Sequence, residues 1–348
     1  MLIETNKMHN RNATMEVLDI RLQGEDSTNL REELVASLTR PASYRSIPSI
    51  LLWDDRGQEL FEDIMNCPQY YPFRAELALL SGYSSQMVTA TGQSRLIIEL
   101  GAGNCKKTLA YLTALEKRRI PTAYFAVDIA PDSLTNSLAQ LSENMSSFQY
   151  VICHGMLGSY DDCVQLLEDN DAFGAEDVLF LWFGNSITNL PWKKATELIN
   201  HLLCTKSRRT KLLLSVDGCR SEELILTAYD LPGGQSRQFI QNGLTHANAV
   251  LGDEVFDCAD WDFEGSWDPV SAMHNSYHVA KRDLTIQVDG QTVPFTKGEK
   301  LHGIMSGKWD SEIVGRLCEA AGVTVERHWT RPVDNFGKSM TLVLMEMY

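Results

Sequence analysis

Short apolar runs alternate with segments of helical periodicity through the middle of this chain, and this alternation most constrains its fold. Five runs read as buried strands: Arg95–Leu100, Ala123–Asp128, Tyr150–His154, Val178–Phe183 and Lys211–Val216. Four segments between them have the spacing of amphipathic helices: Lys107–Lys117, Ser133–Ser142, Tyr160–Leu167 and Lys194–Leu203. Strands buried on both faces are continuously apolar, and strands that alternate with helices form parallel βαβ units. The sequence therefore predicts an α/β fold with a Rossmann-like, doubly wound sheet.

The rhythm changes after Gly218, which indicates an insertion into this sheet. Residues 220–250 are helical in pattern with a break at 231–234, and strand-like pieces follow at Ser276–Ala280 and Leu284–Val288. The sheet pattern then resumes with one helix and two strands: Ser311–Ala321, Val323–Trp329 and Met340–Met347.

A chain of 348 residues is long enough for two domains. We predict a flexible tail at residues 1–14 and a sheet domain made of residues 75–219 and 309–348. The remaining segments, 15–74 and 220–308, are predicted to form a second, substrate-binding domain.

A glycine-containing loop follows the first strand and opens a helix, which is where an open α/β sheet binds its ligand. The loop begins at Glu99 and includes Gly101 and Gly103, and the next strand ends at Asp128. An acidic residue at that point can bind both ribose hydroxyls of a nucleoside. The third glycine of the dinucleotide fingerprint is missing, and so is a P-loop lysine. These residues favour S-adenosylmethionine over NAD. The structural alternative is that Asp128 or Asp132 caps the helix near Ser133.

Charge and apolar patterning exclude several classes of function. The chain has 31 basic and 46 acidic residues, so its formal charge is 31 − 46 = −15, which opposes binding to nucleic acid or to an anionic membrane. The longest strongly apolar run, Val178–Phe183, is far shorter than the roughly 20 residues of a membrane-spanning helix.

Cysteine and histidine usage suggest a reduced, metal-free protein. The eight cysteines include no Cys-x-x-Cys pair, and the N-terminus lacks the apolar core of a secretory signal. We therefore expect a cytoplasmic location. His274 and His278 are four residues apart but lack a carboxylate motif beside them, so no metal site is predicted. No heptad pattern is evident, and we expect a monomer.

Four ordered motifs carry a resemblance that extends over about residues 15–348. They are Trp53-Asp54-Asp55-Arg56-Gly57 with Tyr70-Tyr71-Pro72-Phe73-Arg74-Ala75-Glu76 downstream, the loop Glu99–Thr108, the segment Asn185–Leu190, and Ser306-Gly307-Lys308. In this order they resemble the S-adenosylmethionine-dependent histidine α-N-methyltransferases of ergothioneine synthesis. Relatives of that family methylate tryptophan and dimethylallyltryptophan in fungal alkaloid pathways.

The resemblance implies a cofactor site for S-adenosylmethionine, which leaves as S-adenosylhomocysteine. Gly101, Lys107 and Asp128 match cofactor-binding positions, and Glu99 and Gly103 belong to the same loop and strand end. The cofactor residues are completed by a pair near the adenine, Gly155 and Met156, where bacterial relatives have an aspartate in place of the methionine.

The resemblance also implies how a free amino acid is bound. Tyr70 matches a tyrosine beside the substrate amino group, while Asn189 and Tyr229 match residues that hold its amino and carboxylate groups. Ser306 matches a serine of the side-chain pocket, and Trp53 replaces a tyrosine of the family. Each residue has a structural alternative: the tyrosines as packed aromatics, and Asn189 as the cap of the helix after residue 191.

Methyl transfer from a sulfonium needs a neutral amine aligned with the methyl group, and an α-amino group titrates near ~7.7–8.0. We predict that Tyr70 and Asn189 are catalytic because they orient the amine, with Tyr70 or a water accepting its proton. An inactive methyltransferase fold that serves as a binding module is the non-enzymatic alternative, and the intact motifs oppose it.

One departure from the family decides the expected substrate. The family glutamate that pairs with imidazole, two positions before the pocket serine, is Ile304 here. An apolar residue there favours a larger flat ring, so we expect tryptophan, with some tolerance for indoles such as dimethylallyltryptophan. The alternative is a shift in alignment that makes Glu299 the true acid and histidine the substrate.

Overall fold

The computed structural model describes residues 16–21, 26–92, 95–169, 177–204, 209–333 and 338–347. The tail predicted at residues 1–14 lies outside these ranges. The chain divides into two compact units. The described residues within Met1–Arg21, Pro72–Cys219 and Lys308–Tyr348 form the sheet unit, and those within Leu22–Tyr71 and Arg220–Gly307 form the inserted unit.

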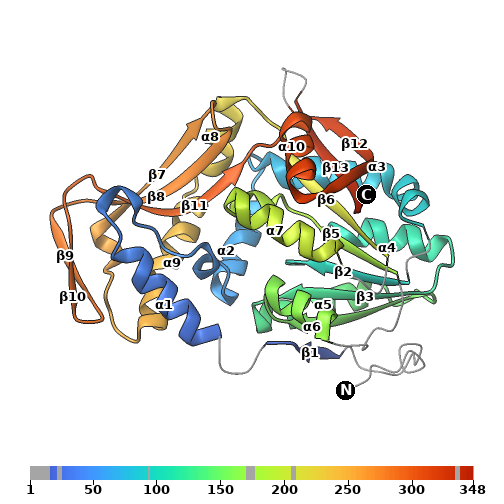
Figure 1. The fold of residues 1–348 in the computed structure, drawn as a ribbon, viewed down its shortest axis with the longest axis horizontal. Helices are drawn as coiled ribbons and strands as arrows, with labels where there is room; N and C mark the ends of the chain where they lie inside the picture. Colours follow the sequence, from blue (N-terminus) through green and yellow to red (C-terminus); the bar gives the residue numbers. More distant parts are fainter. Residues whose placement is uncertain are drawn as a thin grey trace. The chain divides into compact units, whose positions relative to one another are not determined.

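In the part of the chain that the structure describes, the sheet unit is built on one mixed sheet of eight strands in the order β1-β4-β3-β2-β5-β6-β13-β12 (Figure 1). Its strands are β1 (Val17–Asp19), β2 (Leu96–Leu100), β3 (Thr122–Asp128), β4 (Val151–Leu157), β5 (Val178–Trp182), β6 (Thr210–Asp217), β12 (Val323–Pro332) and β13 (Ser339–Met347). The pairs from β1 to β6 are parallel, and β13 is antiparallel to both of its neighbours. The predicted Rossmann-like α/β fold is confirmed.

Within the described ranges, six α-helices and one short 3-10 turn accompany the sheet: α3 (Tyr71–Thr91), α4 (Thr108–Lys117), α5 (Pro131–Asn144), α6 (Tyr160–Asp169), η4 (Ser186–Asn189), α7 (Trp192–Leu203) and α10 (Ser311–Ala321). Local signals set their ends: α10 begins where Asp310 accepts a bond from the Ile313 amide, and it ends at Gly322 with a φ of +70°. A buried apolar cluster from β2, β3 and the helices α3, α4 and α5 forms the core of this unit.

The structure differs from the sequence prediction at the N-terminal boundary, where residues from 15 onward were assigned to the second domain. Val17–Asp19 instead extends the sheet as β1, parallel to β4. Gly155 makes room for this strand, because a Cβ there would lie 3.1 Å from Val17 and 2.6 Å from Leu138. A three-residue strand in a polar segment has no apolar run that reveals it.

The inserted unit combines helices with two small antiparallel sheets. Its helices and 3-10 turns are α1 (Asp26–Leu38), η1 (Ala42–Tyr44), η2 (Ser49–Leu52), α2 (Asp55–Asn66), α8 (Glu222–Tyr229), α9 (Gln235–Leu251) and η5 (Cys258–Asp260). Its strands are β7 (Trp261–Asp268), β8 (Met273–Ala280), β9 (Leu284–Val288), β10 (Gln291–Phe295) and β11 (Lys300–Gly307). β8 lies between β7 and β11, β9 pairs with β10, and an apolar core of its own fills the unit.

The motif Trp53–Gly57 is explained locally as a helix start in the inserted unit. Asp54 is the N-cap of α2 and accepts a 2.8 Å hydrogen bond from the Gly57 amide. It also accepts a 2.7 Å bond from the Asn242 amide group on α9. A Cβ at Gly57 would lie 1.9 Å from the carbonyl oxygen of Leu52, so only glycine fits. The motif therefore fixes where Trp53 is placed.

His278 on β8 is a buried base without hydrogen bonds. Its side chain is 1% exposed, and among the described residues neither ring nitrogen has a partner. Burial lowers its pKa to about 3, with a smaller contribution from the charge of His302. His278 therefore stays neutral in the fold, whereas in the unfolded chain it takes up a proton below about pH 6.5. The unfolded state then binds more protons, so stability falls as the pH drops from about 6.5 toward 3.

We predict that His278→Leu makes the protein less sensitive to acid. Between pH 6.5 and 4.5 the wild type should lose about 2 kcal/mol through this residue, because the full slope of about 1.4 kcal/mol per pH unit is reached only below pH 6.5. The variant should retain that free energy of unfolding in urea titrations at the two pH values. His201→Leu removes an exposed histidine and serves as the control. Equal acid sensitivity of the wild type and His278→Leu would contradict the assignment.

Candidate active site

The glycine loop after β2 is tied to the end of β3 by backbone hydrogen bonds. The amides of Gly101 and Ala102 donate to the carbonyl oxygen of Val127 at 3.0 and 3.1 Å. The Gly103 amide donates to Oδ2 of Asp128 at 3.0 Å. Gly101 and Gly103 have φ values of +66° and +52°, which favour glycine at both positions. The loop and the acid that were predicted to act together are therefore in direct contact.

Asp128 is not the N-cap residue of α5, which differs from the structural alternative for this residue. Its Oδ1 accepts from the amides of Ile129 and Ala130 at 2.8 and 3.3 Å, within its own turn. The N-cap of α5 is Ala130, which makes no side-chain capping bond, and Asp132 lies in the first turn of that helix. Asp128 is instead the buried carboxylate that shapes the loop at the carboxyl end of β3.

Glu99 faces the interior of the sheet unit. Its two oxygens accept from the Thr108 hydroxyl at 2.7 and 2.6 Å, and the Tyr124 hydroxyl donates to one of them. Burial raises the pKa of this carboxyl to about 7, although both hydroxyl donors act in the opposite direction. Glu99 thus holds the first residue of α4 against β2 and β3. Its predicted contact with the cofactor remains a prediction.

Gly155 and Met156 lie inside β4 rather than at its end. Met156 is 0% exposed and pairs with Val127, while Gly155 packs beneath α5 and beside β1. β4 ends one residue later, at Leu157. The structure therefore gives both residues a packing role, and their predicted place beside the adenine stays untested.

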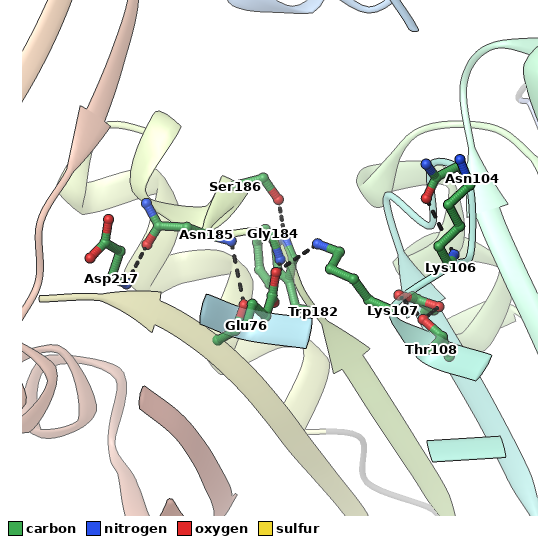
Figure 2. A network of polar contacts seen from close by, with 12 residues as sticks. Glu76, Asn104, Lys106, Lys107, Thr108, Trp182, Gly184, Asn185, Ser186 and Asp217 are labelled. Carbon is green, nitrogen blue, oxygen red and sulfur yellow. Dashed lines mark hydrogen bonds and ion pairs between the residues drawn. The ribbon is translucent and has the colours of Figure 1, made fainter. Parts of the chain in front are cut away.

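The strand order reverses direction between β2 and β5, which is where open α/β sheets bind ligands. From β2 the chain first proceeds to β3 and β4, and then returns to β5 on the other side. Lys107 follows the glycine loop at this point, and its Nζ lies 2.7 Å from Oε2 of Glu76 (Figure 2). Oε1 of Glu76 accepts a 2.7 Å hydrogen bond from the Gly184 amide, just after β5.

Asn189 ends the short turn η4 that follows β5. It is partly exposed, and among the described residues its side chain has no hydrogen-bond partner. The N-cap of α7 is Pro191 and makes no side-chain bond, so the helix-cap alternative for Asn189 does not hold. A fixed turn with an unengaged amide is suited to bind a ligand with both a donor and an acceptor.

Asn185, at the start of the same turn, is fully engaged. Its Oδ1 accepts from the Asp217 amide at 2.9 Å (Figure 2). Its Nδ2 donates to the Thr188 hydroxyl at 2.9 Å. Asp217 in turn pairs with Lys308 at 2.9 Å, with neither side chain exposed. The lysine of the Ser306–Lys308 motif is therefore a structural residue of the sheet unit.

The predicted substrate residues of the inserted unit meet in a cluster of aromatic rings. Trp53 contacts Phe61 and Phe239 edge to face, with ring centroids 5.0 Å apart in both cases. Phe61 lies 5.9 Å from Tyr70, and Tyr70 lies 6.0 Å from Tyr229. We call these five residues the aromatic cluster. Edge-to-face geometry of this kind holds rings in defined orientations.

Tyr229 connects this cluster to the sheet of β8 and β11. Its ring stacks on His274 at 4.5 Å, and its hydroxyl lies 2.9 Å from that of Ser306. In the ladder Ser306 is opposite His274, and Ile304 is opposite Ser276. Opposite residues share a face, so Ile304 and Ser306 lie on one side of β11 together.

Glu299, the acid of the alternative alignment, has partners of its own. Its Oε1 lies 2.9 Å from the Arg45 guanidinium, and its Oε2 accepts from the Thr296 amide at 3.0 Å. It precedes β11, whereas Ser306 is near the far end of that strand. Seven residues of strand separate the two by about 20 Å.

Within the described residues no group of three or more His, Cys, Asp or Glu side chains is placed to hold a metal ion. His274 and His278 belong to β8, where a spacing of four residues separates side chains by about 13 Å. No helix in the described ranges is long and apolar enough to span a membrane.

Comparison with known proteins identifies the source of these motifs. The family model described as histidine-specific, S-adenosylmethionine-dependent methyltransferase matches residues 30–343. The chain belongs to this family. It is an S-adenosylmethionine-dependent N-methyltransferase, and its cofactor is S-adenosylmethionine.

Fungal relatives resemble the methyltransferase over nearly its whole length. N-methyltransferase imqF of Aspergillus flavus is 38% identical over 331 residues, which is 94% of this chain and 88% of the relative. Ergothioneine biosynthesis protein 1 of Neurospora crassa is 28% identical over 93% of this chain, but only over 36% of its own length. 4-Dimethylallyltryptophan N-methyltransferase easF of Aspergillus fumigatus is 25% identical over 91% of this chain and 94% of its own.

Two residues of the methyltransferase site, Tyr160 and Glu76, were not recognised from the sequence. Tyr160, the first residue of α6, has its hydroxyl 2.6 Å from where a Gly101 Cβ would lie, and burial raises its pKa to about 12. Glu76 is the last residue of the family motif Tyr70–Glu76, yet no role was assigned to it. Neither has a local signature, because the partners of each are distant in the sequence.

We predict that Asp128→Asn weakens S-adenosylmethionine binding by the methyltransferase. The amide keeps the size of the side chain but removes the charge that accepts from the Gly103 amide and is predicted to hold the ribose. The expected loss is about 1.5–3 kcal/mol, typical of a hydrogen bond to a charged group. Isothermal titration calorimetry on the folded variant measures it. Unchanged affinity would rule Asp128 out as a cofactor residue.

Proposed function

We propose that this methyltransferase methylates the α-amino group of a free aromatic amino acid, with L-tryptophan as the preferred substrate. The observation that carries the proposal is Ile304, which lies on the same face of β11 as Ser306. Ser306 in turn contacts Tyr229 of the aromatic cluster at 2.9 Å. A flat apolar ring is the side chain that such surroundings suit.

These residues would not supply hydrogen-bond partners for both ring nitrogens of a histidine substrate. Its imidazole has two polar nitrogens, and leaving one buried without a partner costs about 1–3 kcal/mol. Ile304 offers no hydrogen bond, and Glu299 already pairs with Arg45 at 2.9 Å. Indole has a single N–H, which the Ser306 hydroxyl can accept. Tryptophan therefore leaves fewer polar atoms unpaired than histidine does.

The reaction requires the amine nitrogen to attack the methyl carbon in line with the sulfonium. The N–C bond forms as the C–S bond breaks, the sulfonium becomes the neutral thioether of S-adenosylhomocysteine, and the amine loses a proton. In this proposal Tyr70 and Asn189 orient the amine, with Tyr70 or a water accepting the proton, and Tyr229 anchors the carboxylate. Orientation supplies most of the acceleration in such a transfer.

Histidine is the second candidate, because the matching family is described as histidine-specific. A decorated indole is the third, since a relative is named for 4-dimethylallyltryptophan. An apolar pocket discriminates only weakly by size, so tolerance for substituted indoles is part of the proposal. The choice among the three depends on side-chain chemistry at Ile304 and is open to direct test.

We predict that tryptophan is methylated fastest in a panel of substrates. The purified protein is incubated with methyl-labelled S-adenosylmethionine and each proteinogenic amino acid or 4-dimethylallyltryptophan, and products are identified by mass spectrometry. A labelled methyl on the α-nitrogen is expected. Preferential methylation of histidine in competition with tryptophan would refute the indole preference. Absence of transfer to any amino acid, with cofactor binding intact, would refute the function itself.

We predict that Ile304→Glu shifts selectivity from tryptophan toward histidine. A carboxylate there gives imidazole a partner but places a charge against the indole ring, so kcat/KM for tryptophan should fall by about tenfold or more. Met305→Glu is the matched control, because it adds the same charge one residue along, opposite Asn275 and on the other face of β11. A similar loss in both variants would show a general charge effect rather than a pocket contact.

A further inference from the structure

We propose that Glu76 is a positioning residue for methyl transfer. Its carboxylate connects Lys107, on the cofactor side, to the turn that carries Asn189, on the amine side. The part of the inference that concerns Asn189 rests on the proposed function, whereas the part that concerns Lys107 does not.

The contacts of Glu76 are direct and use both oxygens. Oε2 lies 2.7 Å from Nζ of Lys107, and Oε1 accepts a 2.7 Å hydrogen bond from the amide of Gly184 (Figure 2). These partners come from the loop after β2 and the loop after β5, which are adjacent strands in the sheet. One side chain of α3 thus bridges the two strand ends at which the sheet binds its ligand.

Burial of the Glu76 side chain holds its contacts with Lys107 and Gly184 in place. The Glu76 side chain is only 2% exposed, so its charge depends on the two protein donors instead of water. Lys107 is 15% exposed and retains N–H donors for another partner. Gly184 has a φ of +85°, which favours glycine, and a Cβ there would lie only 3.0 Å from Nζ of Lys107. The lysine is therefore held at a defined place beside the cofactor loop.

The backbone that Glu76 supports, at Gly184 and Asn185, has an unusual conformation. Gly184 and Asn185 are both in the left-handed region, with φ values of +85° and +62°. A non-glycine residue in that region is strained unless its surroundings fix it. Asn185 is fixed on one side by the Asp217 amide and the Thr188 hydroxyl, both at 2.9 Å. Glu76 fixes the other side through Gly184, and η4 with Asn189 follows directly.

Two variants separate the two halves of the bridge. Glu76→Gln keeps an oxygen that can accept from the Gly184 amide but loses the charge opposite Lys107. Glu76→Ala loses both contacts and leaves the turn without its support. Glu116→Ala is the matched control, because Glu116 is also a carboxylate of the sheet unit that accepts from backbone amides, those of residues 149, 150 and 151.

The readouts are the affinity for S-adenosylhomocysteine by calorimetry and the kcat and KM of the amino acid that the wild type methylates. Glu76→Gln should weaken S-adenosylhomocysteine binding by about tenfold, as expected for a charge-assisted contact, with a smaller loss in kcat. Glu76→Ala should lower kcat by about a hundredfold, because a small misplacement of the amine is costly in an aligned reaction. Glu116→Ala should lower the melting temperature and change neither quantity by more than about twofold.

Three results would overturn the proposal. They are an unchanged affinity in Glu76→Gln, a kcat loss in Glu76→Ala no larger than in Glu76→Gln, or equal losses in the Glu116→Ala control. If Glu76→Ala does not fold, a double-variant cycle of Glu76→Gln and Lys107→Met decides the cofactor half. The double variant should bind no more weakly than the worse single one, and additive losses would refute the coupling. S-adenosylhomocysteine affinity needs no amino acid, so a wrong substrate assignment leaves this test intact.

Discussion

The sheet unit depends on an ion pair from which water is excluded. Lys308 and Asp217 are 2.9 Å apart, and neither side chain is exposed. Removing two charges from water is costly, and removing one partner alone typically costs about 3–5 kcal/mol. Asp217 compensates with a further bond from the Cys219 amide at 2.9 Å. The chain leaves the sheet unit after Cys219 and re-enters it at Lys308, so the pair joins the two ends of the long insertion. An insertion whose ends meet leaves the host sheet undisturbed, and β13 can pair with β6 along its length.

Three other buried acids around the carboxyl ends of the strands are each stabilised in a different way. Glu99 is held by hydroxyl donors and has a raised pKa, so it carries a charge only in part near neutrality. Asp128 is held by backbone amides, and Glu76 by one amide and Lys107. The site thus contains three buried acids with different hydrogen-bond donors next to the loop that is predicted to receive a cationic sulfonium. Because every one of them is bonded to the backbone or to a neighbouring strand, loop shape and charge are set together.

Much of the fold was readable from the sequence because its physical signal is local. The strands from Leu96 to Asp217 are buried on both faces and therefore appear as apolar runs. The break between α8 and α9 was readable because Pro232 and the two glycines after it interrupt a helical pattern. β1 was not, because three residues at a sheet edge carry no pattern. The site shows the same division: Gly101, Gly103 and Asp128 act over a short loop, whereas the contact of Glu76 with Gly184 spans 108 residues. Contacts of that range are created by the fold and have no counterpart in spacing.

Under the proposed function, substrate specificity depends on how strand β11 distributes its side chains between its two faces. β11 has an irregularity between His302 and Ile304, and without it strict alternation would place Ile304 on the face opposite Leu301. With it, Leu301, Ile304 and Ser306 are opposite His278, Ser276 and His274, and all six lie on one face. One extra residue thus decides whether the side chain at position 304 reaches the face that contacts Tyr229. The identity of that side chain then decides whether the face can satisfy a second ring nitrogen. Under the proposed function, a change of substrate would require no change of fold, only a different residue at position 304, which the bulge places on the face that contacts Tyr229.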